Sequence, residues 1–211
     1  MKTLTKEDIV KQVRVKLDEI GLNESGMMDA DSDNCNLDAV IESCINEAYR
    51  LVAMNADVSL LEGKTMSDAT MTIGSDLVGR VQLPADFLRL VNARLSSWHS
   101  SYSKLISEDE PLYRMQSNKW VSATPDCPVA AIVHRSGGKE LELFKAANTN
   151  DTLSVLTYIA AYPESEESVA LSDQTVEAFI YYVAGLTMVT FKEESATDFF
   201  KLAQSLLGNE Q

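Results

Sequence analysis

The sequence predicts an α+β fold, in which the N- and C-terminal segments form a helical bundle and a β-rich domain is inserted between them. Apolar residues recur with helical spacing near both ends of the chain, whereas between Ala69 and Tyr158 the spacing shifts towards two. The stretch 79–98 marks this change, because Val81 and Leu83 alternate with polar neighbours as in a half-buried strand. A chain of 211 residues is long enough for one large domain or two small ones.

Two amphipathic helices are expected near the N-terminus. The first begins after Thr5, a favourable N-cap, and ends at Gly21. Asn36 caps the second, which frays between Asn55 and Ser59. The apolar faces comprise Ile9, Val10, Val13, Leu17 and Ile20 in the first helix, and Leu37, Val40, Ile41, Cys44, Ile45, Ala48, Leu51 and Val52 in the second.

The loop between these helices carries three aspartates in alternate positions, Asp29, Asp31 and Asp33. This spacing is typical of the start of a calcium-binding loop, which also needs a bidentate carboxylate at its twelfth position. Val40 occupies that position. We therefore expect a solvated acidic loop here, and we predict no metal site in the protein.

Strands are predicted in the middle of the chain, with a short helix among them. The candidate strands are residues 69–73, 79–83, 88–96, 102–106, 129–134, 140–144 and 153–158. The glycine pair at 137–138 indicates a hairpin between two of these strands. Residues 110–115 are expected to form the short helix, with Pro111 in its first turn. Two prolines within 125–128 favour an extended loop.

The C-terminal segment returns to a helical pattern. Ser172 or Asp173 caps a helix that includes residues 178–191, a stretch without any charge. This stretch is too short to span a bilayer, which requires about 20 residues, so we expect it to be buried in a core or between subunits. A last helix begins at Ser195 and ends at Gly208.

These elements divide the chain into two parts. We assign residues 1–66 and 160–211 to the helical bundle and residues 67–159 to the inserted β-rich domain. The reason is that amphipathic helices at the two ends of a chain bury their apolar faces by packing against each other.

Charge and cysteine content restrict the function. The chain has 18 basic and 32 acidic residues, a formal net charge of −14, which argues against a sequence-reading DNA-binding protein. The cysteines are odd in number and widely spaced: Cys35, Cys44 and Cys127. Neither a disulfide framework nor a zinc site is therefore indicated. This cysteine content is consistent with a protein of a reducing compartment. The N-terminus lacks the apolar core of a signal peptide.

The sequence contains no recognisable catalytic motif. His99 and His134 stand alone, without the spacing of paired ligands or catalytic partners. The GxSxG elbow of serine hydrolases and the glycine-rich loops GxxxxGK[ST] and GxGxxG do not occur. We therefore predict a protein that is not an enzyme and carries no cofactor.

Three stretches carry a resemblance to a known family. They are LPADFLRLVNARL (residues 83–95), SEDEPLYRMQSNKW (107–120) and PVAAIVHRSGGKELELF (128–144). With the N-terminal pair of helices, they resemble the head-to-tail adaptor proteins of short-tailed bacteriophages. That family is also called tail tubular protein A, and it includes ring proteins at the portal vertex of crAss-like phages. The similarity extends from about Lys6 to Leu207, and the family's fold is a helical bundle with a β-rich insertion.

The resemblance implies a structural virion protein at the portal vertex or tail, assembled in the host cytoplasm. About twelve copies would form a ring that binds the portal, extends the DNA channel and offers a platform for the next tail component. DNA would pass through without being held, because acidic walls repel phosphates. The alternative is a non-viral cytosolic protein-binding module that acts as a monomer or dimer.

The last helix is the expected docking element. It carries four large apolar residues that we predict to contact the portal or another partner: Phe199, Phe200, Leu206 and Leu207. Buried aromatic anchors dominate protein interfaces, which favours such residues as contacts. The alternative is that all four fill the core of the monomer.

Overall fold

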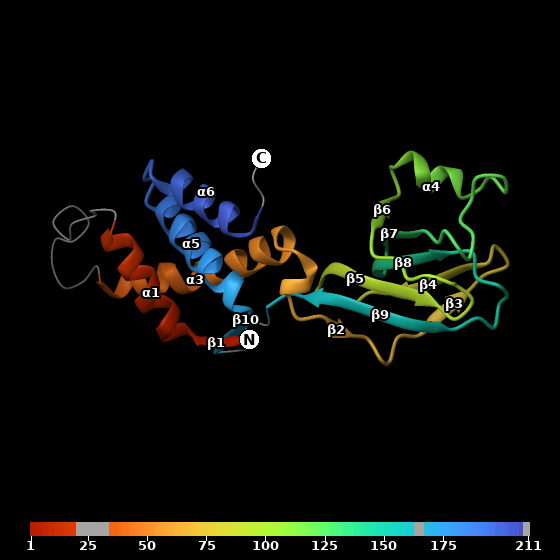
Figure 1. Ribbon diagram of the computed structural model, residues 1–211, viewed down its shortest axis with the longest axis horizontal. Helices are drawn as coiled ribbons and strands as arrows, with labels where there is room; N and C mark the ends of the chain where they lie inside the picture. The colour runs from red at the N-terminus through yellow and green to blue at the C-terminus, as the bar shows by residue number, and fades with distance from the viewer. Residues whose placement is uncertain (20–33, 163–166, 209–211) are drawn as a thin grey trace. The chain divides into compact units, whose positions relative to one another are not determined.

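The computed structural model describes residues 1–19, 34–162 and 167–208 (Figure 1). Within these residues the protein is mixed α/β, 37% helical and 29% strand, with five helices and three sheets. The predicted α+β fold of a helical bundle with an inserted β-rich domain is therefore wrong. The chain divides into two compact units, Met1–Glu62 with Ala161–Gln211, and Gly63–Ala160. We call them the helical unit and the sheet unit.

Among its described residues, the helical unit contains four helices, a single 3-10 turn and a two-stranded sheet. Its elements are β1 (Lys2–Thr5), α1 (Lys6–Glu19), α3 (Asn34–Asn55), η1 (Val58–Leu60), β10 (Ser168–Leu171), α5 (Asp173–Thr190) and α6 (Ala196–Leu206). The helix α5 contacts α1, α3 and α6, so it forms the centre of this unit (Figure 1). The domain boundaries expected at 66/67 and 159/160 stay a prediction, because compact units within one chain do not establish domains that fold alone.

The strand β1 explains why the helical-bundle prediction failed. It pairs antiparallel with β10, with Lys2 opposite Leu171 and Thr5 opposite Ser168. The side chain of Leu4 points into the core and is 2% exposed. Four residues are too few to reveal a period of two, and the partner strand lies at the other end of the sequence. Pairing between distant segments therefore adds a sheet that local patterns do not predict.

The start of α1 agrees with the sequence. The amide of Asp8 donates to the Thr5 hydroxyl over 3.1 Å, and the amide of Thr5 donates to the Asp8 carboxylate over 3.2 Å. This reciprocal capping confirms Thr5 as the N-cap. The hydrogen bonds from Thr5 also lower the pKa of Asp8. The acidic loop that follows this helix, with Asp29, Asp31 and Asp33, lies outside the described residues.

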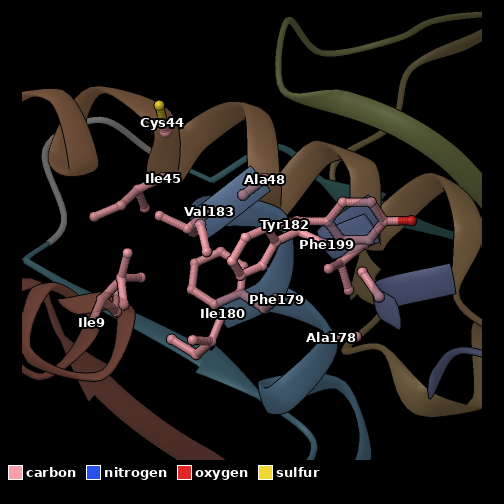
Figure 2. Close-up of a cluster of buried hydrophobic side chains, with 14 of the residues drawn as sticks. Ile9, Cys44, Ile45, Ala48, Ala178, Phe179, Ile180, Tyr182, Val183 and Phe199 are labelled. Atoms are coloured by element: carbon pink, nitrogen blue, oxygen red, sulfur yellow. The ribbon is translucent and has the colours of Figure 1, made fainter. Parts of the chain in front are cut away.

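The core of the helical unit surrounds α5 (Figure 2). The side chains of Phe179, Ile180 and Val183 are at most 1% exposed. Other helices contribute to the same cluster, with Ile9 from α1, Ile45 and Ala48 from α3, and Phe199 from α6 (Figure 2). The predicted burial of residues 178–191 is confirmed for most of the stretch. The exposed large apolar side chains of this stretch, Val189 and Phe191, lie at its end.

Two sheets form the sheet unit. Its elements are β2 (Lys64–Thr65), β3 (Met71–Ile73), β4 (Val78–Gln82), β5 (Phe87–Leu95), β6 (Leu105–Ser107), α4 (Pro111–Met115), β7 (Ala130–Arg135), β8 (Gly138–Phe144) and β9 (Leu153–Ala160). One sheet has the order β2-β9-β5 and the other β3-β4-β8-β7-β6. All pairs are antiparallel except β6 with β7.

The two sheets share one apolar core. Its buried side chains come from both, and include Val81 and Leu141 from the larger sheet and Leu90 and Leu156 from the smaller. The predicted hairpin is confirmed, because Arg135 of β7 pairs with Gly138 of β8 across a two-residue turn. Gly138 has a φ of 115°, a conformation that disfavours any other residue.

Candidate docking surfaces and a charged pocket

The four predicted docking residues of α6 have different environments. Phe199 and Leu207 are 0% and 8% exposed and belong to the core of the helical unit. Phe200 is partly buried against the same core, with its ring 6.2 Å from that of Tyr182. Leu206 is 45% exposed. Docking through this helix stays a prediction, and Leu206 is the member of the set most accessible to a partner.

Sequence reasoning missed Leu202, one helical turn before Leu206. It is also exposed, so the two leucines form a small apolar face on the outside of α6. Their spacing of four residues places them on the same side of the helix. The periodicity of the helix shows two apolar stripes, and it does not by itself reveal which stripe packs inward.

A second apolar surface lies on the sheet unit, along α4 and the loop that follows it. We call residues 111–121 the apolar segment. Its exposed large side chains are Leu112, Met115, Trp120 and Val121, and Trp120 is 83% exposed. The ammonium group of Lys119 lies 5.0 Å from the centre of the Trp120 ring, so a cation borders this apolar side chain.

Local hydrogen bonds hold the apolar segment in shape. Pro111 occupies the first turn of α4, as the sequence predicts. The helix begins one residue later than expected, because Glu110 stands at the N-cap position. The side chain of Gln116 donates to the Leu112 carbonyl over 2.9 Å and accepts from the amide of Ala123 over 2.8 Å. The loop after the helix is therefore tied back to α4.

Tyr113 connects α4 to the larger sheet through a ring contact and a hydrogen bond. Its ring meets that of Phe144 edge-on, with the centres 5.7 Å apart. Its hydroxyl donates to the carboxylate of Glu142 on β8 over 2.8 Å. Burial, reinforced by this hydrogen bond, raises the pKa of Tyr113 to about 12. The phenol therefore remains a donor at neutral pH.

Glu142 is the centre of a charged network. It is 3% exposed, although carboxylates are rarely buried. Arg80 Nε and Arg135 Nη2 each lie 3.4 Å from its Oε1 atom. Register explains the first contact, because Arg80 on β4 stands directly opposite Glu142 on β8. Paired cations and hydrogen bonds are the usual condition under which a carboxylate can be buried.

Both arginines have further acidic partners. Asp76 binds Arg80 with a shortest distance of 2.6 Å, and the hydrogen bond from Arg80 lowers the pKa of Asp76. Glu108 lies 3.4 Å from Arg135. The sequence shows each of these charges but not their grouping, since the grouping depends on which strands pair.

A pocket of about 640 Å³ adjoins this network. Its lining comes from β4, β7 and β8, from α4 and from the loop after α4. Charged groups in the lining are Asp76, Arg80, Arg114, Arg135, Glu142 and Lys145. The pocket therefore lies beside the apolar segment and within the sheet unit.

The histidines do not join these features into a catalytic or metal site. His99 Nδ1 lies 2.6 Å from an oxygen of Asp126, and both side chains are largely exposed. Among the described residues, no three histidine, cysteine or acidic side chains gather closely enough to hold a metal ion. In the same part of the chain, no helix has the length and apolar character required to cross a bilayer. The sequence matches no model of a known protein family and no curated protein.

Proposed function

We propose that this chain is a structural virion protein, a head-to-tail adaptor whose copies form a ring that binds the portal. In this role it extends the DNA channel and provides a platform for the next tail component. It catalyses no reaction and needs no cofactor. The observation that carries the proposal is the exposure of four large apolar side chains within the apolar segment of a strongly acidic protein.

An apolar cluster of this kind supports protein docking. Single exposed apolar residues are normal on any surface, but a group of them bordered by polar residues marks an interaction site. Tryptophan is also enriched among the residues that dominate binding energy. The amide of Trp120 donates to the side-chain oxygen of Asn118 over 3.1 Å, so part of the backbone order that docking needs is present before binding.

The stretches that resemble adaptor proteins support the same surface. Residues 83–95 lead from the end of β4 through β5, residues 107–120 include α4, and residues 128–144 form the hairpin of β7 and β8. The second stretch contains most of the apolar segment. The third supplies Glu142, which holds Tyr113 of that segment in place.

Net charge fits a wall along which DNA moves. A subunit with a charge of −14 repels phosphates, so duplex DNA is expected to slide past without being retained. A gel-shift assay at physiological salt should therefore show no complex with duplex DNA. Tight, salt-sensitive binding would contradict the proposed channel role.

Electron microscopy of the chain mixed with the portal ring of the same virus tests the proposal. The expected result is a second ring beneath the portal, with the sheet unit of every copy against it. Failure to bind the portal, combined with a constant monomeric or dimeric mass in solution, would favour the cytosolic protein-binding module instead.

A further inference from the structure

The acceptors that line the pocket are already used by the protein itself. The carboxylate of Glu142 accepts from Arg80, Arg135 and Tyr113. The carboxylate of Asp76 accepts two hydrogen bonds from Arg80 and one from the amide of Val78. A carboxylate has about four positions for donors, so little acceptor capacity is left for a ligand.

Donors in the lining remain available. The side chains of Arg114, Lys145 and Ser122 line the pocket and have no hydrogen bond or ion pair with any other residue that the structure describes. Guanidinium and ammonium groups can only donate, and the serine hydroxyl can donate as well. A ligand that satisfies this set must therefore bring acceptor atoms, and negative charge would match the two cations.

The two cations come from anchored positions. Arg114 follows Tyr113, which is fixed to Glu142 and Phe144. Lys145 has a φ of 72°, in the left-handed region that few residues other than glycine adopt. Its carbonyl accepts from the indole nitrogen of Trp98 over 3.3 Å, which helps to hold this backbone in place. Residues in such conformations are concentrated at functional sites.

We propose that the pocket binds an oxyanion, a carboxylate or phosphate group carried by a small organic molecule. Arg114 and Lys145 bind its oxygens and Ser122 donates a further hydrogen bond. The fork of a guanidinium group matches both kinds of oxyanion. A volume of about 640 Å³ exceeds that of the anion alone and lies in the usual range of small-molecule sites. The rings of Tyr113 and Phe144 offer apolar contact to the remainder of the ligand. This inference does not depend on the proposed virion role.

The two tryptophans of the chain provide a direct readout. The indole N–H of Trp98 binds the Lys145 carbonyl, so its NMR signal responds to changes at Lys145. A ¹⁵N-labelled sample gives two indole signals, and a Trp120→Phe variant assigns them. Inorganic phosphate and, separately, succinate are titrated at constant ionic strength made up with chloride. We expect a saturable shift of the Trp98 signal with at least one of them, and the responding anion identifies the oxyanion class.

Variants decide whether the shift reports on the pocket. Arg114→Gln and Lys145→Gln each remove one charged hydrogen bond and should weaken the apparent affinity about tenfold. Lys104→Gln is the matched control, since Lys104 is an exposed cation of the same unit that does not line the pocket. A far-UV circular dichroism spectrum like that of the wild-type protein, recorded before titration, shows that the variants are folded. The proposal is overturned if neither anion gives a saturable shift, or if Arg114→Gln and Lys145→Gln bind as tightly as Lys104→Gln.

Discussion

The helical unit and the sheet unit place their polar and apolar groups in different ways. The core of the helical unit contains no charged side chain among its described residues, and its buried Thr187 donates to the Val183 carbonyl within its own helix. The sheet unit buries Glu142 in a network of arginines and a tyrosine. It also exposes four large apolar residues within ten consecutive positions, 112–121.

Exposed apolar residues of the helical unit are instead spread over several helices. They include Val15 on α1, Met54 on α3 and Val189 on α5, and the apolar face of α6 is limited to the pair Leu202 and Leu206. Scattered residues of this kind are ordinary, whereas a local group is not. The comparison indicates that the helical unit is organised for packing and that the sheet unit carries the features suited to binding.

The largest expected effect is in the core of the helical unit. Phe179→Ala removes a fully buried ring at the centre of α5 and should lower the free energy of unfolding by about 3–5 kcal/mol. Leu202→Ala on α6 is the control, because its side chain is 46% exposed, and it should change stability by less than about 0.5 kcal/mol. Urea denaturation followed by circular dichroism measures both. Equal effects would contradict the assignment of the core.

The second largest effect is expected from a substitution of the buried carboxylate Glu142 in the sheet unit. Glu142→Gln leaves the two arginines with their outer partners but weakens three hydrogen bonds, so we expect a loss of about 1–3 kcal/mol. Glu47→Gln is the matched control, since Glu47 pairs with Arg50 on the surface of α3, and it should cost less than about 0.5 kcal/mol. Similar losses of unfolding free energy for the two variants in denaturant titrations would mean that the buried Glu142 network stabilises the protein no more than a surface ion pair does.

These two cases show what could be predicted from the sequence. The helices α3 and α5 are predicted because their apolar spacing is local and continues over several turns. The burial of Glu142 is not predicted, because it depends on Arg80 standing opposite it across β4 and β8. The strand β1 is missed for the same reason, since its partner is distant in sequence.

The candidate sites show the same limit. The apolar residues of α6 can be identified from the sequence, but which of them face inward depends on how α6 packs against α5, where Gly185 lies against Phe199 and Phe200. The pocket could not be predicted, because Arg80, Arg114 and Lys145 come from separate elements that only the fold brings together. Individual elements follow from local periodicity, whereas sites built from several elements require the tertiary structure.

A smaller effect is expected from two neighbouring tyrosines of the helical unit. The hydroxyl of Tyr182 is buried and has no hydrogen-bond partner among the described residues. Tyr182→Phe should therefore leave stability unchanged or raise it by up to about 1 kcal/mol. Tyr181→Phe should lower stability by about 0.5–1 kcal/mol, because Lys16 Nζ lies 3.2 Å from the Tyr181 hydroxyl. Thermal unfolding that ranks the two variants in the opposite order would contradict this assignment.

The smallest effect concerns acid stability in the sheet unit. The hydrogen bond from Arg80 lowers the pKa of Asp76 below its ordinary value of 3.8. The resulting stabilisation is fully present above that value and is lost as the pH falls through the lower pKa of the folded state. Asp76→Asn should therefore show a slightly flatter loss of stability below pH ~4 than the wild-type protein. Identical acid profiles in denaturant titrations would show that the ion pair with Arg80 contributes nothing measurable.

Docking through the apolar segment is tested most directly by co-sedimentation with the portal ring. Trp120→Ser and Leu206→Ser each remove one exposed apolar side chain, from the sheet unit and the helical unit respectively, and circular dichroism should show both variants folded. We predict that Trp120→Ser weakens portal binding by about 2 kcal/mol or more, while Leu206→Ser binds like the wild-type protein. Wild-type binding by Trp120→Ser, with loss in Leu206→Ser, would contradict the account and place the docking surface on α6.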